Sequence, residues 1–251
     1  MSVWLTNLAD VLRGAGVDVV EMRYERGPYA GKTWKQVGFN SRGLTELRGV
    51  MWHHDASPVG DSGSAKVVNG YGVSPTGALG WCMYMDIAPA AAAWIDMRGV
   101  WHLYAAGLSN HAGLGSSVLA PANTGNQFYY GIETDHTTGE AWPAAQLDSL
   151  RRGTAAIMTA YDLDPAKALE FHKTYAPGRK NDPDGLDLKK ERDVLTDLMR
   201  GSNQVKINKL IRQRRRTRAK AKQAKKNGDS VKGLPTRIKK LTERIRRLRR
   251  G

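Results

Sequence analysis

Charge is distributed unevenly along this chain of 251 residues. Residues 203–251 contain 20 lysines and arginines against two acidic residues, Asp229 and Glu243, so this segment has a net charge of +18. Because the whole chain carries +15, residues 1–202 are left with a net charge of −3. The two segments therefore need separate structural explanations. We predict one domain over residues 1–202 and a strongly basic C-terminal tail over residues 203–251.

The first segment has the patterning of an α/β domain. Hydrophobic residues make up 41% of the chain and seven residues are tryptophans, which predicts a packed core. Apolar residues at helical spacing predict helices within residues 5–16 and 143–162 and after Asp187. Runs rich in β-branched and aromatic residues predict strands; these lie within residues 17–22, 49–56, 99–107 and 128–134. Strands that alternate with helices predict an α/β fold around one central sheet.

The basic tail has two different patterns. Residues 212–230 contain no apolar side chain larger than alanine, so this stretch cannot bury enough surface to offset its ordering entropy, although it can be helical by propensity. Further on, apolar residues recur at intervals of four and three, which predicts a short amphipathic helix or a weak helix pair. These residues are Leu234, Ile238, Leu241, Ile245 and Leu248. The tail is therefore expected to be helical or flexible.

Three residues far apart in the sequence are candidates for a metal site. His53 ends a predicted buried strand, and His172 and Asp182 lie in the turn-rich stretch HKTYAPGRKNDPDG. Two imidazoles, one carboxylate and a water at the fourth position make a catalytic zinc site. The spacing from His53 to His172 is not diagnostic by itself, and a single histidine is more often structural or solvated. Asp184 is a rival to Asp182 as the third ligand.

Four motifs, in order along the chain, carry a family resemblance. MWHHDA, NHAG, GIETD and HKTYAPGRKNDPDG resemble the zinc-dependent N-acetylmuramoyl-L-alanine amidases of type 2, over roughly residues 45–200. That family shares its fold with the peptidoglycan recognition proteins, which implies a central mixed sheet flanked by helices. The resemblance implies hydrolysis of the amide between N-acetylmuramic acid and L-alanine in peptidoglycan. The N-terminal segment and the stretch GVWHLYAAGLSNHAG further resemble endolysins of phages that infect actinobacteria.

The resemblance also implies roles for individual residues. It makes His53, His172 and Asp182 the ligands of a Zn²⁺ ion. Lys180, two residues before the last ligand, matches a lysine that stabilises the developing oxyanion. Glu133 in GIETD matches a glutamate that some members use as a general base.

Two further positions are weaker matches to the family pattern. His111 in NHAG matches a loop histidine that lines the substrate groove. Some members place a tyrosine near the metal, and Tyr84 is the candidate here, although its alignment is not fixed. Cys82 is the only cysteine of the chain, which excludes an internal disulfide framework, and we expect it to be a small buried apolar residue.

Location and partners follow from charge and resemblance. No signal-peptide pattern is visible in residues 1–14, so we expect synthesis in the host cytoplasm; the resemblance implies holin-dependent release to the cell wall. We expect residues 203–251 to bind anionic wall polymers or an anionic membrane surface. One alternative is a nucleic-acid binder. Its binding would be nonspecific, because the tail lacks aromatic residues for base stacking. Another is a peptidoglycan-binding module that has no metal and no activity.

Overall fold

The computed structural model divides the chain into two compact units, residues 1–196 and 197–251. Each unit is described by itself. The structure describes residues 2–25, 29–55, 89–136, 138–227 and 230–248. Cys82 and Tyr84 lie outside these described residues, so the predictions made for them stay predictions.

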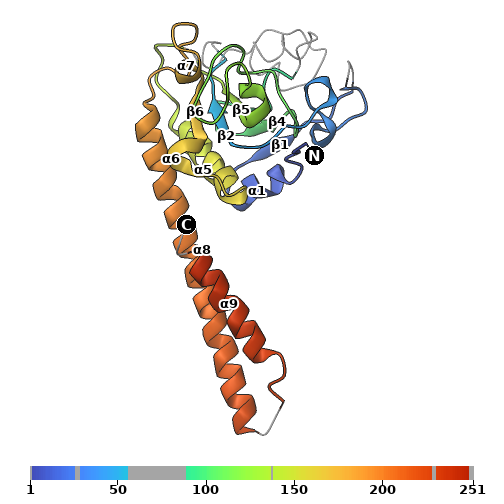
Figure 1. Cartoon of the computed structure of the whole chain (residues 1–251), viewed down its shortest axis with the longest axis vertical. Helices are drawn as coiled ribbons and strands as arrows, with labels where there is room; N and C mark the ends of the chain where they lie inside the picture. The colour runs from blue at the N-terminus through green and yellow to red at the C-terminus, as the bar shows by residue number, and fades with distance from the viewer. Residues whose placement is uncertain (1, 26–28, 56–88, 137, 228–229, 249–251) are drawn as a thin grey trace. The chain divides into compact units, whose positions relative to one another are not determined.

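One mixed sheet forms the centre of the first unit (Figure 1). Within the described residues it has six strands in the order β1-β4-β3-β5-β2-β6. Strands β3 and β4 pair antiparallel, and the other neighbours pair parallel. The strands are β1 (Val19–Glu21), β2 (Gly49–Trp52), β3 (Ala93–Ile95), β4 (Trp101–Leu103), β5 (Tyr129–Thr134) and β6 (Leu169–Phe171). The predicted α/β fold with a central mixed sheet is confirmed.

The sequence patterns predicted four of these strands and missed β3 and β6. Both missed strands have three residues, as β1 and β4 do, but unlike those two they do not lie within longer runs of β-branched and aromatic residues. Strand β3 also ends an alanine-rich run, and alanine favours helices. Neighbouring strands decide the conformation of these two segments, because β3 pairs with both β4 and β5, and β6 pairs with β2.

Helices flank the sheet, and several begin with recognisable caps. Asp164 accepts a hydrogen bond from the backbone N–H of Ala166 and precedes Pro165, a residue suited to the first helical turn. Asp187 caps the next long helix by accepting from the N–H of Lys190 at 2.7 Å. The elements are α1 (Leu8–Gly14), η2 (Trp34–Gln36), η3 (Phe39–Ser41), α4 (Gly125–Phe128), α5 (Ala144–Ala160), α6 (Pro165–Ala168), α7 (His172–Tyr175), α8 (Leu188–Lys226) and α9 (Leu234–Leu248).

Helix α5 covers one face of the sheet through two tryptophans. The indole N–H of Trp52 on β2 donates to Thr154 Oγ1 at 3.0 Å, and that of Trp101 on β4 donates to Ser149 Oγ at 3.2 Å. Both tryptophans are fully buried, so each brings a large apolar surface into the core while its polar N–H stays paired. Gly153 leaves room for this packing, because a Cβ there would lie 2.3 Å from Trp101.

The opposite face of the sheet packs on a second buried cluster. Alternation along β2 turns Met51 away from the α5 side, and His53 follows on the same side as Met51. The cluster consists of Met51, Ala112, Ala120, Phe128, Tyr129, Tyr175 and Ala176. This second face therefore supports the residues that form the candidate site.

The second unit contains two helical segments. Helix α8 continues through residues 212–226, the stretch predicted to be helical or flexible, and α9 follows after a turn. Leu210 and Ile211 of α8 pack against Leu241 and Ile245 of α9. The tail is therefore helical in its described residues, and it forms the helix pair that the apolar spacing allowed. Among the described residues, no helix is both long and apolar enough to cross a membrane.

Candidate metal centre and active site

Three neighbouring parallel strands bring the candidate residues together. Strand β2 lies between β5 and β6 in the sheet. His53 directly follows β2, His172 directly follows β6, and Glu133 is the second-last residue of β5. Ligand sites of parallel sheets form at the carboxyl ends of the strands, so three segments that are distant in the sequence meet at one edge.

The three predicted metal ligands form a compact cluster. His53 Nδ1 lies 2.8 Å from His172 Nδ1 and 3.2 Å from Asp182 Oδ2. His172 Nδ1 lies 3.0 Å from the same carboxylate oxygen, and all three residues are buried. Ligand atoms at zinc bond lengths in a tetrahedral arrangement are about 3.3 Å apart. The three side chains therefore have the chemistry and nearly the spacing needed to hold one metal ion.

The proton on His172 strengthens this interpretation. His172 Nε2 lies 3.0 Å from the carbonyl oxygen of Ala112, and a carbonyl only accepts hydrogen bonds, so Nε2 carries the proton of the neutral ring. The lone pair of Nδ1 then faces the carboxylate of Asp182, which is also an acceptor. Two acceptors 3.0 Å apart need a shared proton or a metal ion between them. A metal ion satisfies both groups.

Burial and charge set the titration of the cluster. Burial lowers the pKa of His53 to about 4, assisted by His172 and opposed by Asp182. Burial acts to raise the pKa of Asp182, but the neighbouring His172 and His53 outweigh it and hold that pKa well below its usual value. Near neutral pH the site therefore offers a neutral imidazole at His53 and an ionised carboxylate, which are the forms that bind metal.

Glu133 lies beside the cluster, and its pKa is shifted in the opposite direction from that of Asp182. Its Oε1 is 3.9 Å from His53 Nδ1, and no described residue gives its buried Oε2 a hydrogen bond. Burial raises its pKa well above the usual value, and the negative charges of Asp182 and Asp55 add to this, while Lys180 opposes it. A raised pKa suits a group that accepts a proton and gives it up again near neutral pH.

Lys180 lies in the exposed loop that leads to Asp182. Its backbone N–H donates to the carbonyl of Ala176 at 3.1 Å. Its positive charge acts on the site, because it lowers the pKa of both Glu133 and His53. Stabilisation of an oxyanion by Lys180 stays a prediction, which the effect of its charge on these two pKa values supports.

His111 is buried beside His53. Its Nδ1 lies 2.9 Å from His53 Nε2, on the side of that ring opposite to the ligand cluster, and only 8% of the residue is exposed. The predicted groove-lining role stays a prediction, since residues 56–88 lie outside the description. The contact with a metal ligand is an additional finding.

Other histidine and aspartate residues near the predicted ligands in the sequence have partners outside the ligand cluster. His54 Nδ1 accepts a long hydrogen bond, 3.3 Å, from the backbone N–H of Asp184. The Asp184 carboxylate accepts from the N–H of Gly139 at 2.9 Å and does not belong to the ligand cluster. His136 is fully buried and stacks on Trp142 with 4.0 Å between ring centroids, so an aromatic side chain further along the chain covers this turn.

Two residues outside the predicted site also support it. The guanidinium of Arg179 donates to the carbonyls of Ala112 and Leu114 at 2.7 and 2.6 Å. Asn126 accepts from the backbone N–H groups of His111 and Ala112. No local pattern marks Asn126, because its partners lie 14 and 15 residues away.

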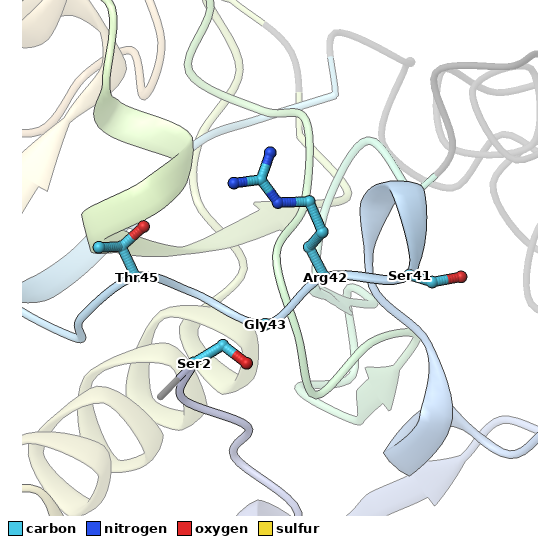
Figure 2. Close-up of a pocket in the computed structure, with 5 residues that line it drawn as sticks. All are labelled: Ser2, Ser41, Arg42, Gly43 and Thr45. Carbon is cyan, nitrogen blue, oxygen red and sulfur yellow. The ribbon is translucent and has the colours of Figure 1, made fainter.

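A pocket elsewhere in the first unit does not coincide with these residues. It has a volume of about 410 Å³ and includes one charged side chain, Arg42 (Figure 2). Its lining residues are Ser2, Ser41, Arg42, Gly43 and Thr45. None of the predicted site residues lines it, and it offers no combination of groups for hydrolysis.

Comparison with known proteins identifies the family. Residues 43–185, more than half of the chain, match the Amidase_2 family of N-acetylmuramoyl-L-alanine amidases. The chain belongs to this family. The matched region includes every predicted ligand and catalytic residue. Among curated proteins, no sequence matches the chain.

Solved structures that are similar to this chain include a derivative of AmpD and two endolysins. A selenomethionine derivative of AmpD is 21% identical, with 63% of this chain and 92% of that chain covered and a TM-score of 0.48. The endolysin amidase LysCS from Clostridium intestinale is 12% identical, with coverages of 72% and 95% and a TM-score of 0.44. A mutant endolysin from Bacillus subtilis is 14% identical, with coverages of 71% and 99% and a TM-score of 0.47.

Proposed function

We propose that this protein is a zinc-dependent peptidoglycan hydrolase that cleaves the amide between N-acetylmuramic acid and L-alanine. The observation that carries the proposal is the buried cluster of His53, His172 and Asp182, whose ligand atoms lie 2.8 to 3.2 Å apart. Family membership supports the substrate class. The retained ligand set argues against the alternative of a wall-binding module without activity.

The residues around the cluster divide the chemistry between them. When bound there, zinc would polarise the amide carbonyl and lower the pKa of a water molecule. Glu133, with its raised pKa, accepts the proton of the attacking water and passes it to the departing amine. Lys180 places a positive charge near the oxygen that becomes negative, an effect whose loss costs about 3 kcal/mol for one such donor.

Two measurements test this proposal. Metal analysis of the purified protein is expected to find about one zinc per chain. Mass spectrometry of digested peptidoglycan is expected to find new free L-alanine amino termini. New reducing sugar ends, or cuts within the peptide, would assign a different bond to the enzyme. A metal-free protein that still binds walls would favour the binding module.

We further propose that the protein is a phage endolysin that accumulates in the host cytoplasm and reaches the wall through a holin. The motif resemblance to endolysins of actinobacterial phages supports this. Expression in a bacterial host with and without a holin tests it. Lysis is expected only with the holin; lysis without it would mean that the protein reaches the wall by another route.

For the second unit we propose electrostatic capture of a phosphate-rich anionic wall polymer. Leu241 and Ile245 at the centre of α9 are already buried against α8, so this apolar face can enter a membrane interface only if the helix pair opens. The exposed side chains of α8 and α9 are predominantly basic. A surface of this kind attracts polyanions over about 10 Å at moderate ionic strength and loses that attraction in salt.

Matched charge variants of the full chain test this role. The tail variant replaces Lys220, Lys222, Lys239 and Lys240 with glutamine; the control replaces Lys35, Lys167, Lys189 and Lys190, which are exposed lysines of the first unit. The tail variant is expected to bind isolated walls more weakly at low salt, and the control is expected to bind like the wild type. Equal binding by both variants would refute the role. Stronger retention on anionic vesicles or DNA than on walls would redirect it to those partners.

A further inference from the structure

A single loop, residues 110–112, contacts both histidine ligands on the sides that face away from the ligand cluster. The side chain of His111 meets His53, with 2.9 Å between Nδ1 and Nε2. The backbone carbonyl of Ala112 meets His172 Nε2 at 3.0 Å. The loop therefore supplies one hydrogen-bond partner to each imidazole.

The hydrogen bonds of His111 determine where the proton of His53 lies. His111 Nε2 is 3.1 Å from the carbonyl oxygen of Tyr129, which can only accept, so this nitrogen carries the proton of the neutral His111 ring. His111 Nδ1 is then an acceptor, and His53 Nε2 must donate to it. A neutral His53 ring has one proton, so its Nδ1 keeps a free lone pair that faces His172 and Asp182.

The loop is itself held in place. Asn126 Oδ1 accepts from the backbone N–H groups of His111 and Ala112 at 2.9 and 2.7 Å. The Nδ2 of the same side chain donates to Asn110 Oδ1 at 2.9 Å. Gly131 on β5 makes room for the imidazole, because a Cβ there would lie 2.4 Å from His111 Cγ. The ring is thus fixed between a strand without a side chain at that point and a clamped backbone.

We infer that His111 is a positioning residue that holds His53 in the tautomer and orientation required of a metal ligand. The inference rests on the proposed metal site and gives His111 a role toward the ion, where family resemblance implied a role toward the substrate. Hydrogen-bond partners behind metal ligands typically change metal affinity by about 10- to 100-fold when they are removed. Asn126 acts one step further back, by holding the loop.

Zinc affinity of the full-length chain, measured by competition with a chromophoric chelator, tests the inference. His111→Leu removes the acceptor behind His53 and is expected to weaken zinc binding about 10- to 100-fold. His111→Asn is the matched variant, because its side-chain oxygen can take the position of the imidazole Nδ1, and it is expected to restore most of the affinity. Leucine and asparagine variants that both bind zinc like the wild type would overturn the inference.

A measurement on the wild type decides the same question without a variant. Two-bond ¹⁵N–¹H correlation spectra of the metal-free protein report which ring nitrogen of each histidine carries the proton. The expected result is protonated Nε2 in His53 and in His111. A proton on His53 Nδ1 would overturn the inference even if His111→Leu fails to fold.

The outcome is separable from that of the proposed function. A wild-type chain that does not bind zinc would contradict the proposed function itself. A wild-type chain that binds zinc and releases L-alanine amino termini, together with a His111→Leu variant of unchanged zinc affinity, would contradict only the role of His111.

Discussion

The candidate metal cluster of the first unit and the helix pair of the second unit use charged and polar residues in opposite ways. In the cluster, three buried groups lie within 3.2 Å of one another, and each has a defined partner behind or beside it. In the helix pair, a few apolar side chains are buried and the basic residues are mostly exposed. The comparison teaches that one region depends on the position of each group, whereas the other depends on the number of charges.

The largest effect is expected at a ligand of the cluster. Asp182→Ala removes one of three ligands, so zinc binding is expected to be lost, together with the several kcal/mol that a metal contributes to the transition state. This corresponds to a loss of activity of at least about 10³-fold. Asp184→Ala is the control, because that carboxylate lies outside the cluster, and it is expected to retain zinc. Equal losses in both variants would contradict the distinction.

A smaller loss is expected at Glu133, which we propose to be the general base and which does not belong to the cluster of His53, His172 and Asp182. Glu133→Gln is expected to reduce turnover by about 10²- to 10⁴-fold while zinc affinity stays near that of the wild type. The raised pKa of Glu133 adds a pH signature. A base works only when ionised, so wild-type activity rises with pH through that pKa, and the variant loses this limb. A variant that keeps the limb would show that another group is the base.

Stability provides a third test, at a buried carboxylate of the first unit that is remote in sequence from the ligands. Burial acts to raise the pKa of Asp96, but His102, whose Nε2 lies 3.6 Å from Oδ2, and hydrogen bonds from Val100 and Arg98 outweigh it and hold the pKa well below its usual value. Asp96→Asn is expected to lower the free energy of unfolding by about 2 kcal/mol at pH 7. Denaturant unfolding measures this, with the exposed Asp18→Asn as control, expected to stay within about 0.5 kcal/mol.

The pH dependence of this difference has a defined sign. Because the folded-state pKa of Asp96 is depressed, its contribution is complete above the unfolded value of 3.8 and is lost as pH falls through the folded value. The gap between wild type and Asp96→Asn should therefore shrink below about pH 4. A gap that stays constant in acid would mean that the stabilisation comes from packing and does not depend on the charge.

The smallest effects are expected from single charges of the second unit. Lys220→Gln or Lys239→Gln alone is expected to weaken wall binding by less than about threefold, since exposed charge contacts contribute 0.2–1 kcal/mol each. Binding to isolated walls at several salt concentrations measures this. If one such substitution abolishes binding, the second unit also contains a specific site. Its binding would then depend on the position of individual side chains and not only on the number of charges.

Much of this molecule could be predicted from the sequence, for identifiable reasons. Longer elements show their periodicity, as in helix α5, where residues at helical spacing, Leu150, Thr154, Ile157 and Met158, are buried. The candidate ligands His53, His172 and Asp182 could be named because the motifs around them resemble a known family. Sequence spacing alone would not have predicted the metal site, because the separation of 119 residues between His53 and His172 says nothing about their distance in space.

The parts that escaped prediction depend on contacts between distant segments. Strands β3 and β6 exist because neighbouring strands pair with them. The burial of His136 depends on Trp142, and the proton on His53 depends on a carbonyl of residue 129 reached through His111. Such relations become visible only when the sheet has placed the segments side by side.

The clamp formed by Arg179 has a consequence for chimeric enzymes. This guanidinium, which belongs to the APGRK motif, holds the carbonyls of Ala112 and Leu114 in the loop that follows the NHAG histidine. The two motifs are therefore structurally coupled through Arg179, although about 65 residues separate them. An engineer who exchanges residues 171–185 between relatives should therefore keep an arginine at position 179, since the carbonyls of residues 112 and 114 would otherwise lose this donor.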